Sequence, residues 1–576
     1  MSRPVRSVRL GPRDVSVERR LDGSMHLRSP HALSAFPVKL TERLEHWADC
    51  APDRVFLAQR DVRGGWRTLT YAEALDQARR IGECLLRKNV SVERPIAVLS
   101  GNDIEHALLQ LAALYIGVPY APISPAYSLL SSDFAKLRQI LGLLTPGLVY
   151  AADAAYRRAI DATLPGDIEV FSQSNFAELL RSPATRAVDA AHAWVGPNTI
   201  AKFLFTSGST GAPKAVINTQ RMWCSNQEMI RTALAFLREE PPVIVDWAPW
   251  HHTAGGNHDF GLVLYNGGSL YIDEGKPMPG AIETTVKNLR EIAPTWYFTV
   301  PKGYEALLPY LREDSALRHN FFSRLKVLWF AGAGVSQPVF DEMKELGCRS
   351  CGEAVPFLTG LGATETAPMV LARVWETDDA GNMGLPVPGV EVKLMPLEGK
   401  FEMRVKGPNV TPGYWRQPEL TAEAFDEEGF YRLGDAFTLS EPEQGLIFAG
   451  RIAEDFKLAS GTWVHVGPLR ACLIEHCAPL VRDVVITGHG RNELGALVFP
   501  ATDSSTEELR RRLAAFAKSS TGSSNRIARA MLLEEPPSLD AGEITDKGSI
   551  NSRAVLTRRA ALVEELYSGS ARVLLP

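Results

Sequence analysis

The residues best suited to chemistry form a short segment that is rich in hydroxyls and glycines and ends in a lysine. It follows an apolar run and reads Thr206-Ser207-Gly208-Ser209-Thr210-Gly211-Ala212-Pro213-Lys214. Glycines let backbone N–H groups approach an anion closely, hydroxyls donate to phosphate oxygens, and the lysine adds positive charge. The spacing differs from that of a Walker A loop. Its residue types are those of a phosphate-binding loop, although by composition alone the segment could equally be a plain polar connection.

The N-terminal half of the chain alternates predicted strands and helices. Residues 96–99 form an apolar run, Asn102 stands where it can cap the following helix, and Gly117 stands where that helix should end. Residues 118–121 supply the next strand. A strand–helix–strand unit of this kind favours a parallel sheet. Further buried strands are predicted at residues 296–300 and 327–330.

The elements become shorter after residue 450. Residues 484–487 and 494–499 are strand candidates, and Ser505 with Glu508 makes a capping-box pattern at the start of a helix. We therefore predict a domain boundary near Arg451.

Length and composition indicate a soluble globular protein with more than one domain. The 576 residues exceed one ordinary core, and the chain is 45% hydrophobic and 22% charged. A net charge of -5 gives no reason to expect nucleic acid as a partner. No apolar stretch is long enough to cross a bilayer, so no membrane partner is expected.

The cysteines favour a reducing compartment. There are seven, an odd number, scattered along the chain, and the pair Cys348 and Cys351 lacks a second pair at metal-ligand spacing. The arginine-rich N-terminus lacks the apolar region of a secretory signal. We expect a cytoplasmic protein.

The segment 206–214 resembles the phosphate loop of the adenylate-forming superfamily, which includes acyl-CoA synthetases, firefly luciferase and the adenylation domains of peptide synthetases. Other motifs of this superfamily follow in its order as far as Lys547. The resemblance implies an α/β fold with a large N-terminal domain (1–450) of stacked sheets and helices with parallel βαβ units. A hinge at 451–455 and a small, mobile α+β C-terminal domain (456–576) would follow.

The resemblance also implies the reaction. ATP and Mg²⁺ would activate a carboxylic acid as an acyl-adenylate, and the acyl group would pass to coenzyme A. Glu365 matches the magnesium ligand, and Thr364 matches a contact to the α-phosphate. The residues that match the adenine site are Gly332, Ala333, Gly360, Leu361 and Gly362. Leu361 replaces the superfamily's usual aromatic residue, so we expect apolar contact with adenine there.

The ribose site and the hinge match a later pair of motifs. Asp435 would accept hydrogen bonds from both ribose hydroxyls, and Arg451 matches a second ribose contact. Ala453 stands where the superfamily usually has a charged hinge residue, so either the hinge works without that charge or Glu454 or Asp455 replaces it. Two residues match the thioester-forming step: Lys457 and Gly461.

Two further residues are implied to act on the acid. Lys547 matches the superfamily's catalytic lysine, with Asp546 in place of the usual glycine before it. An adjacent acid favours the protonated form of a lysine. His252 matches the position beside the acyl pocket, where it would face the reacting carboxylate or gate the thiol tunnel.

Several stretches resemble bacterial feruloyl-CoA synthases, which implies a hydroxycinnamate such as ferulate and a role in aromatic acid catabolism. These stretches are residues 215–222, 255–258, 264–273, 462–468 and 546–551. The candidate residues of the acid pocket are Trp247, Asn257, His258 and Tyr297, with Trp296 and Phe298 beside the last.

Three alternatives stay open. The acceptor could be a carrier protein, the acid could be another aryl or a fatty acid, or the chain could be a nucleotide-binding regulator without catalysis. The presence of both Glu365 and Lys547 argues against the regulator. The protein is expected to be a monomer or a homodimer.

Overall fold

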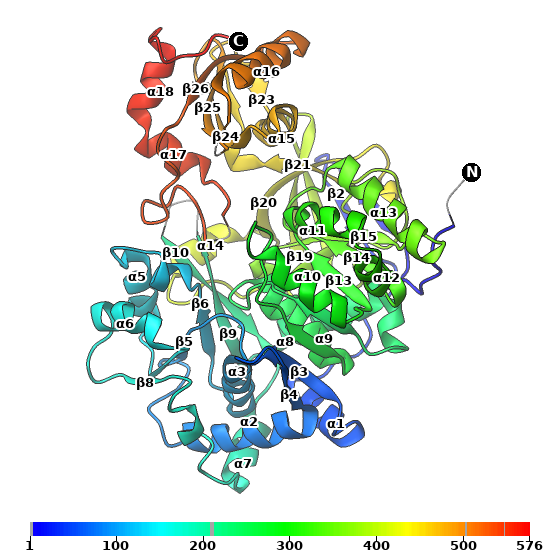
Figure 1. Cartoon of the computed structure of the whole chain (residues 1–576), viewed down its shortest axis with the longest axis vertical. Coiled ribbons are helices and arrows are strands. Elements are labelled where there is room, and N and C mark those ends of the chain that lie inside the picture. Colours follow the sequence, from blue (N-terminus) through cyan, green and yellow to red (C-terminus); the bar gives the residue numbers. More distant parts are fainter. Residues whose placement is uncertain (1–3, 208–211, 502–503, 547) are drawn as a thin grey trace.

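The computed structural model has a large lower body and a smaller upper lobe (Figure 1). It describes residues 4–207, 212–501, 504–546 and 548–576. The large body contains four sheets, and the upper lobe carries the last strands and helices of the chain. This arrangement confirms the predicted fold class.

One sheet of the large body contains the predicted strand–helix–strand unit. β5 (Ile96–Leu99) leads into α3 (Ile104–Ile116), and β6 (Tyr120–Ile123) pairs parallel to β5. The helix ends at Gly117 as predicted, in a left-handed conformation. The sheet order is β10-β9-β6-β5-β7-β8, and the remaining strands are β7 (Leu148–Ala151), β8 (Glu169–Phe171), β9 (Ile200–Ser207) and β10 (Pro213–Thr219).

The predicted cap of this helix was wrong by one residue. Asp103, not Asn102, is the N-cap, and its carboxylate accepts the backbone N–H of His106 at 2.6 Å. Asn102 instead bridges to a distant loop. Its side chain donates to the carbonyl of Ala248 at 2.9 Å and accepts the N–H of Trp250, also at 2.9 Å.

A second sheet has three parallel strands, β13 (Trp296–Thr299), β14 (Val327–Phe330) and β15 (Phe357–Gly362). Two antiparallel strands, β16 (Met369–Arg373) and β17 (Leu385–Pro386), extend it. A four-stranded sheet of order β11-β12-β3-β4 comprises β3 (Val55–Arg60), β4 (Trp66–Thr70), β11 (Val243–Asp246) and β12 (Ser269–Ile272). The longer helices of the large body are α1 (Thr41–Cys50), α2 (Tyr71–Leu85), α5 (Ala135–Leu144), α8 (Gln220–Ala233), α10 (Ile282–Glu291), α11 (Pro301–Glu313), α12 (Ser315–Ser323) and α13 (Gln337–Cys351).

The segment before residue 40 is part of a sheet of the large body. The sequence alone did not predict a role for it. It forms the hairpin of β1 (Ser16–Arg19) and β2 (Met25–Arg28), and β2 pairs antiparallel with β18 (Glu391–Leu397). The sheet continues with β19 (Lys400–Lys406), β20 (Tyr431–Thr438) and β21 (Ile447–Arg451). The hairpin therefore completes a six-stranded sheet that ends at the predicted hinge.

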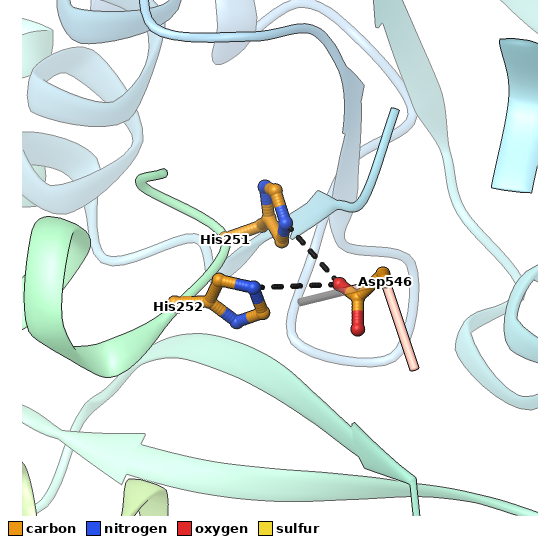
Figure 2. A group of neighbouring side chains, drawn as sticks. All are labelled: His251, His252 and Asp546. Atoms are coloured by element: carbon orange, nitrogen blue, oxygen red, sulfur yellow. Dashed lines mark ion pairs between the residues drawn. The ribbon is translucent and has the colours of Figure 1, made fainter. Parts of the chain in front are cut away.

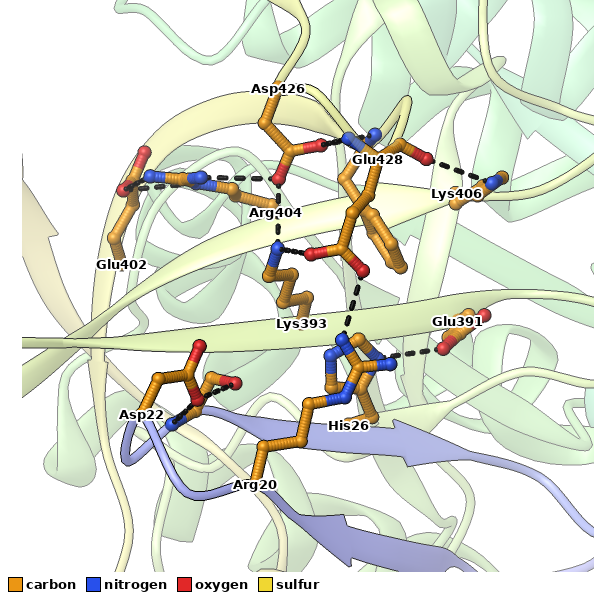
Figure 3. A network of polar contacts seen from close by, with 12 residues as sticks. Arg20, Asp22, His26, Glu391, Lys393, Glu402, Arg404, Lys406, Asp426 and Glu428 are labelled. Atoms are coloured by element: carbon orange, nitrogen blue, oxygen red, sulfur yellow. Dashed lines mark hydrogen bonds and ion pairs between the residues drawn. The ribbon is translucent and has the colours of Figure 1, made fainter.

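A polar network holds this sheet together across distant segments (Figure 3). Asp426 accepts Lys393 at 3.2 Å and Arg404 at 3.1 Å, and Glu428 links Lys393 to Arg20 of the hairpin. Burial alone would raise the pKa of Asp426, but hydrogen bonds from the Phe430 backbone, Arg404 and Lys393 outweigh it and lower that pKa to about 2. Asp426 is thus held ionised.

We expect Asp426→Asn to lower the free energy of unfolding at neutral pH by about 2 to 4 kcal/mol, because Lys393 and Arg404 each lose one of their two carboxylate partners. The lowered pKa of Asp426 contributes about 2 kcal/mol to the free energy of unfolding. This contribution is fully present above the unfolded pKa near 3.8 and is lost as the pH falls toward 2. Urea unfolding at several pH values tests this. An exposed control, Asp167→Asn, should be neutral, and equal effects of both variants would contradict the network's role.

The upper lobe has its own core. Its strands are β22 (Phe456–Lys457), β23 (Trp463–Val464), β24 (Val481–Thr487), β25 (Leu494–Pro500) and β26 (Ile527–Leu532). Its helices are α15 (Val466–Cys477), α16 (Thr506–Ser519), α17 (Ser552–Arg558) and α18 (Ala560–Tyr567). Ser505 caps α16 as predicted and accepts the N–H of Glu508 at 3.3 Å. Among the described residues, no helix is long and apolar enough to cross a membrane.

Candidate active site

The flanks of the predicted phosphate loop form a β-hairpin. β9 and β10 pair antiparallel, with Thr206 opposite Lys214. Between them, Gly208, Ser209, Thr210 and Gly211 lie outside the described residues, and for Ser207 only the backbone is described. The Lys214 ammonium lies 5.0 Å from the ring centre of Tyr414. This tyrosine links the hairpin to the next motif.

Glu365 lies beside that tyrosine. It occupies a short turn, Thr364–Thr366, directly after β15, and both Thr364 and Glu365 are 8% exposed. The Tyr414 hydroxyl donates to the Glu365 carboxylate at 3.1 Å and also lies 3.1 Å from the Tyr431 hydroxyl. Burial and the nearby Glu365 charge raise the pKa of Tyr414, so its hydroxyl stays protonated.

Backbone hydrogen bonds fix the tyrosine's position. The N–H of Thr411 donates to the carbonyl of Glu365 at 2.8 Å, and the N–H of Trp415 donates to the carbonyl of Ala215 at 2.8 Å. The segment from 411 to 415 therefore ties the Glu365 turn to β10. Sequence reasoning missed this segment, and its signal was the turn Pro412-Gly413 placed before two aromatic residues.

Glu365 fits a magnesium ligand. Within the described part of the chain no lysine, arginine or histidine forms an ion pair with it, although its carboxylate is buried. A buried carboxylate normally has a cationic partner. Oxygen ligands suit Mg²⁺, which is commonly held by one or two carboxylates together with substrate phosphates. A magnesium-bound triphosphate would supply that partner.

The predicted adenine residues follow the carboxyl ends of two neighbouring parallel strands. Gly332 and Ala333 lie just after β14 and are exposed, and Leu361 and Gly362 end β15. Ligands of α/β sheets commonly bind at this end of the strands. A Cβ at Gly360 would lie 2.7 Å from the Trp329 ring, so only glycine fits there.

The predicted ribose pair is in direct contact. Asp435 of β20 and Arg451 at the end of β21 face each other in the strand register, and their side chains form an ion pair at 2.9 Å. Asp435 is 6% exposed. Burial raises the pKa of Asp435 to about 6, although Arg451 acts to lower it.

We expect Asp435→Asn to raise the KM for ATP by about 10- to 100-fold with a smaller effect on kcat, because a charged hydrogen-bond acceptor is lost. In the unmodified protein the KM should rise as the pH falls through about 6, since protonation removes the acceptor. Steady-state kinetics at a series of pH values measures both. A variant that keeps the same pH dependence would show that Asp435 does not titrate in ATP binding.

Two of the predicted acid-pocket residues, Asn257 and His258, lie on a π-helical turn, Ala254–Asp259. Such turns are rare and often mark functional sites. A Cβ at Gly256 would lie 2.1 Å from the carbonyl oxygen of Trp250, so the glycine is required for this close approach. Asn257 donates to Asn218 at 2.8 Å, which fixes the turn against β10.

His258 lies against an aromatic wall. Its ring stacks on Trp296 with centroids 5.3 Å apart and lies 6.2 Å from Trp329. Burial lowers the pKa of His258 to about 3, so the ring is neutral. Its Nδ1 lies 2.8 Å from the Asp259 carboxylate, and its buried Nε2 has no hydrogen-bond partner among the described residues.

Tyr297, another predicted pocket residue, lies on the face of β13 opposite to His258. Its ring packs edge-on against Phe321 and Tyr304 in a separate core cluster, whereas Trp296 and Phe298 face the His258 side. Side chains alternate along a strand, so neighbours on β13 point to opposite faces. The indole N–H of Trp247 donates to the hydroxyl of Thr299, at the end of β13, at 3.3 Å.

His252 meets the C-terminal lobe (Figure 2). Asp546 lies 3.3 Å from Nε2 of His251 and 3.4 Å from Nε2 of His252. Lys547, the next residue, lies outside the described part of the chain. The structure thus brings the residue before the predicted catalytic lysine to the predicted acid site.

The predicted thioester residues lie elsewhere in this orientation. The Lys457 ammonium is 4.0 Å from Glu398 and 4.8 Å from the Trp463 ring centre, and Gly461 makes a turn with φ of +82°. The buried Asp455 contacts Lys400 of β19 at 2.5 Å and His465 at 3.2 Å, whereas Ala453 is exposed. Asp455 therefore makes a charged contact with the large body next to Ala453, which has no charge of its own.

Comparison with known families agrees with this geometry. Residues 44–415 match the AMP-binding enzyme family, and residues 456–571 match the AMP-binding enzyme C-terminal domain. The chain belongs to the AMP-binding enzyme family. Its large and small domains are those of the adenylate-forming superfamily, as the sequence motifs predicted.

The names of similar proteins refer to different acids. A feruloyl-CoA synthase of Amycolatopsis sp is 29% identical over 66% of this chain and 72% of the relative. A carboxylic acid reductase of Mycobacterium marinum is 23% identical over 88% of this chain, which spans only 47% of the reductase. The solved anthranilate CoA ligase AuaEII with anthranoyl-AMP shares the fold at a TM-score of 0.74 and 19% identity, over 92% of this chain and 99% of that one.

Proposed function

We propose that this protein is an ATP-dependent acid:CoA ligase. It adenylates an aryl carboxylic acid, a hydroxycinnamate such as ferulate, and then forms the CoA thioester with release of AMP and pyrophosphate. The observation that carries the proposal is the position of Tyr414. This residue contacts Glu365, Tyr431 and Lys214, and so joins the phosphate hairpin, the carboxylate turn and the strand of Asp435.

The first step joins two anions. A carboxylate oxygen of the acid attacks the α-phosphorus, the bond from that phosphorus to the pyrophosphate oxygen breaks, and pyrophosphate leaves. Lys214 and the hydroxyls of the phosphate loop would hold the leaving group, and Thr364 would contact the α-phosphate. Lys547 would offset the negative charge that develops. Bound Mg²⁺, held by Glu365, would supply further positive charge to the phosphates.

The second step exchanges AMP for the thiol. The sulfur of coenzyme A attacks the carbonyl carbon, the bond to the phosphate oxygen breaks, and AMP leaves. Lys457 and Gly461 would serve this step after the C-terminal lobe turns about residues 451–455. The present contacts of Asp546 with His251 and His252 would then have to break.

The choice of an aryl acid rests on the His258 environment. Trp296 and Trp329 offer flat apolar surfaces. If the Nδ1 hydrogen of His258 is donated to Asp259, its Nε2 is an acceptor that needs a donor. A phenolic hydroxyl on the acid supplies that donor.

We expect His258→Phe to lower kcat/KM for ferulate by about 10- to 100-fold and to leave cinnamate, which has no hydroxyl, within about threefold. The phenylalanine keeps the apolar contact with Trp296 but cannot accept a hydrogen bond. Parallel kinetics on the two acids measure the ratio. Equal losses for both acids would contradict the hydrogen bond to the phenol.

A substrate panel tests the proposed function directly. Hydroxycinnamic, cinnamic, benzoic and medium-chain fatty acids are each offered with ATP and with either coenzyme A or a carrier protein, and AMP release is measured. We expect release with hydroxycinnamates and coenzyme A. AMP release that requires a carrier protein would instead indicate an enzyme that loads a carrier protein. AMP release only with a fatty acid would indicate a fatty acid ligase.

A further inference from the structure

Two histidines of the large domain and one carboxylate of the small domain converge at a single point (Figure 2). His251 and His252 follow one another in the loop after β11, and Asp546 comes from the loop between β26 and α17. Their ligand atoms all lie within 4.8 Å of one another, and the three side chains are 10%, 13% and 10% exposed. In the described ranges this is the one group of three such residues that could hold a metal ion.

The distances suit coordination better than a direct ion pair. Charged N–H···O bonds are about 2.7–2.9 Å long. Here the carboxylate oxygen lies 3.3 and 3.4 Å from the two Nε2 atoms. Ligands about 2.0–2.2 Å from a tetrahedral zinc ion stand about 3.3–3.5 Å from each other. The two separations from Asp546 to the histidines match the edge length of such a tetrahedron.

The chemistry of the three ligands favours a zinc-class ion over magnesium. Imidazole nitrogen suits zinc, cobalt and nickel, whereas magnesium prefers oxygen ligands. Two histidines and one carboxylate also leave a fourth position for water or for a substrate group. The hydroxyl of Tyr127 also hydrogen-bonds to Asp546, and Lys136 is a cation near that carboxylate that would compete with a metal ion.

We infer that His251, His252 and Asp546 form an interdomain site for a divalent zinc-class cation. When it is bound, this cation ties the C-terminal lobe to the acid-binding loop. Its ligands do not include Glu365, which carries the proposed magnesium role. One consequence rests on the proposed function: the tied lobe cannot turn, so the cation should inhibit thioester formation more than adenylate formation.

Zinc titration of the metal-free full-length protein, followed by calorimetry, tests the site. We expect one binding site, weakened about 100-fold or more in Asp546→Asn and in His251→Gln, because each removes a direct ligand. Cobalt should give the visible absorption of a tetrahedral complex in the unmodified protein and lose it in both variants. Thermal unfolding confirms that the variants are folded.

Two controls remove other candidate ligands. His46 and Cys50 lie 3.7 Å apart on an exposed helix face, and Cys348 and Cys351 form the lone CxxC pair. Cys50→Ser and the double variant Cys348→Ser, Cys351→Ser should keep the site. Zinc binding that survives Asp546→Asn and His251→Gln, or no binding at all, overturns the inference. This readout does not depend on activity, so a failed ligase assay and a failed metal site are distinguishable.

Discussion

Replacement of Lys547 by alanine is expected to reduce adenylate formation by about 100- to 1,000-fold, because the transition state loses its charged donor. Thioester formation from supplied acyl-AMP should stay within about threefold, since in the proposed mechanism the lysine would leave the site before that step. Acid-dependent pyrophosphate exchange measures the first half-reaction, and CoA-thioester release from synthetic acyl-AMP measures the second. The contact of the preceding residue, Asp546, with His252 supports this assignment.

The matched control is Lys302→Ala, which removes an exposed lysine whose partner is Glu305. It should leave both half-reactions unchanged. If Lys547→Ala lost both half-reactions equally, this would contradict the proposal that Lys547 acts only in adenylate formation, in one orientation of the C-terminal lobe.

Glu365→Gln is expected to lower pyrophosphate exchange by about 100-fold or more, because the amide keeps the shape of the side chain but loses the charge that would hold magnesium. Higher magnesium concentrations should restore part of the rate if the defect is in metal binding. The Tyr414 hydroxyl, 3.1 Å from the carboxylate, can still donate to the amide oxygen, so folding should survive. Exchange rates over a magnesium series, with thermal unfolding, provide the measurement.

Glu427→Gln is the control for this change, since Glu427 is exposed on the surface. It should behave as the unmodified protein does. A Glu365→Gln protein that is folded and keeps full exchange at every magnesium concentration would show that this carboxylate does not hold the metal.

Local sequence patterns predicted much of the fold. The apolar run 327–330 is β14 as predicted, and Gly117 and Ser505 end and begin their helices as expected, because these signals act within a few residues. Asp103 took the cap that Asn102 was expected to provide, since Asn102 gained partners in a loop about 146 residues away.

The partners of the site residues could not be predicted in the same way. Tyr414 reaches Glu365, 49 residues away, because backbone hydrogen bonds tie the segment 411–415 to the Glu365 turn and to β10. The sequence also could not show which residues of β13 face His258, since a continuous apolar run gives no alternation to distinguish Tyr297 from Trp296. The β1–β2 hairpin joins the sheet through pairing with β18, more than 350 residues later.

The proposal that ATP is cleaved at its α-phosphorus by a carboxylic acid has one direct test. Purified protein is mixed with ATP, Mg²⁺, labelled pyrophosphate and single acids, and label entering ATP is counted. We predict exchange that requires the acid and is strongest with hydroxycinnamates. Folded protein that binds ATP but gives no exchange with any aryl or fatty acid would contradict the account.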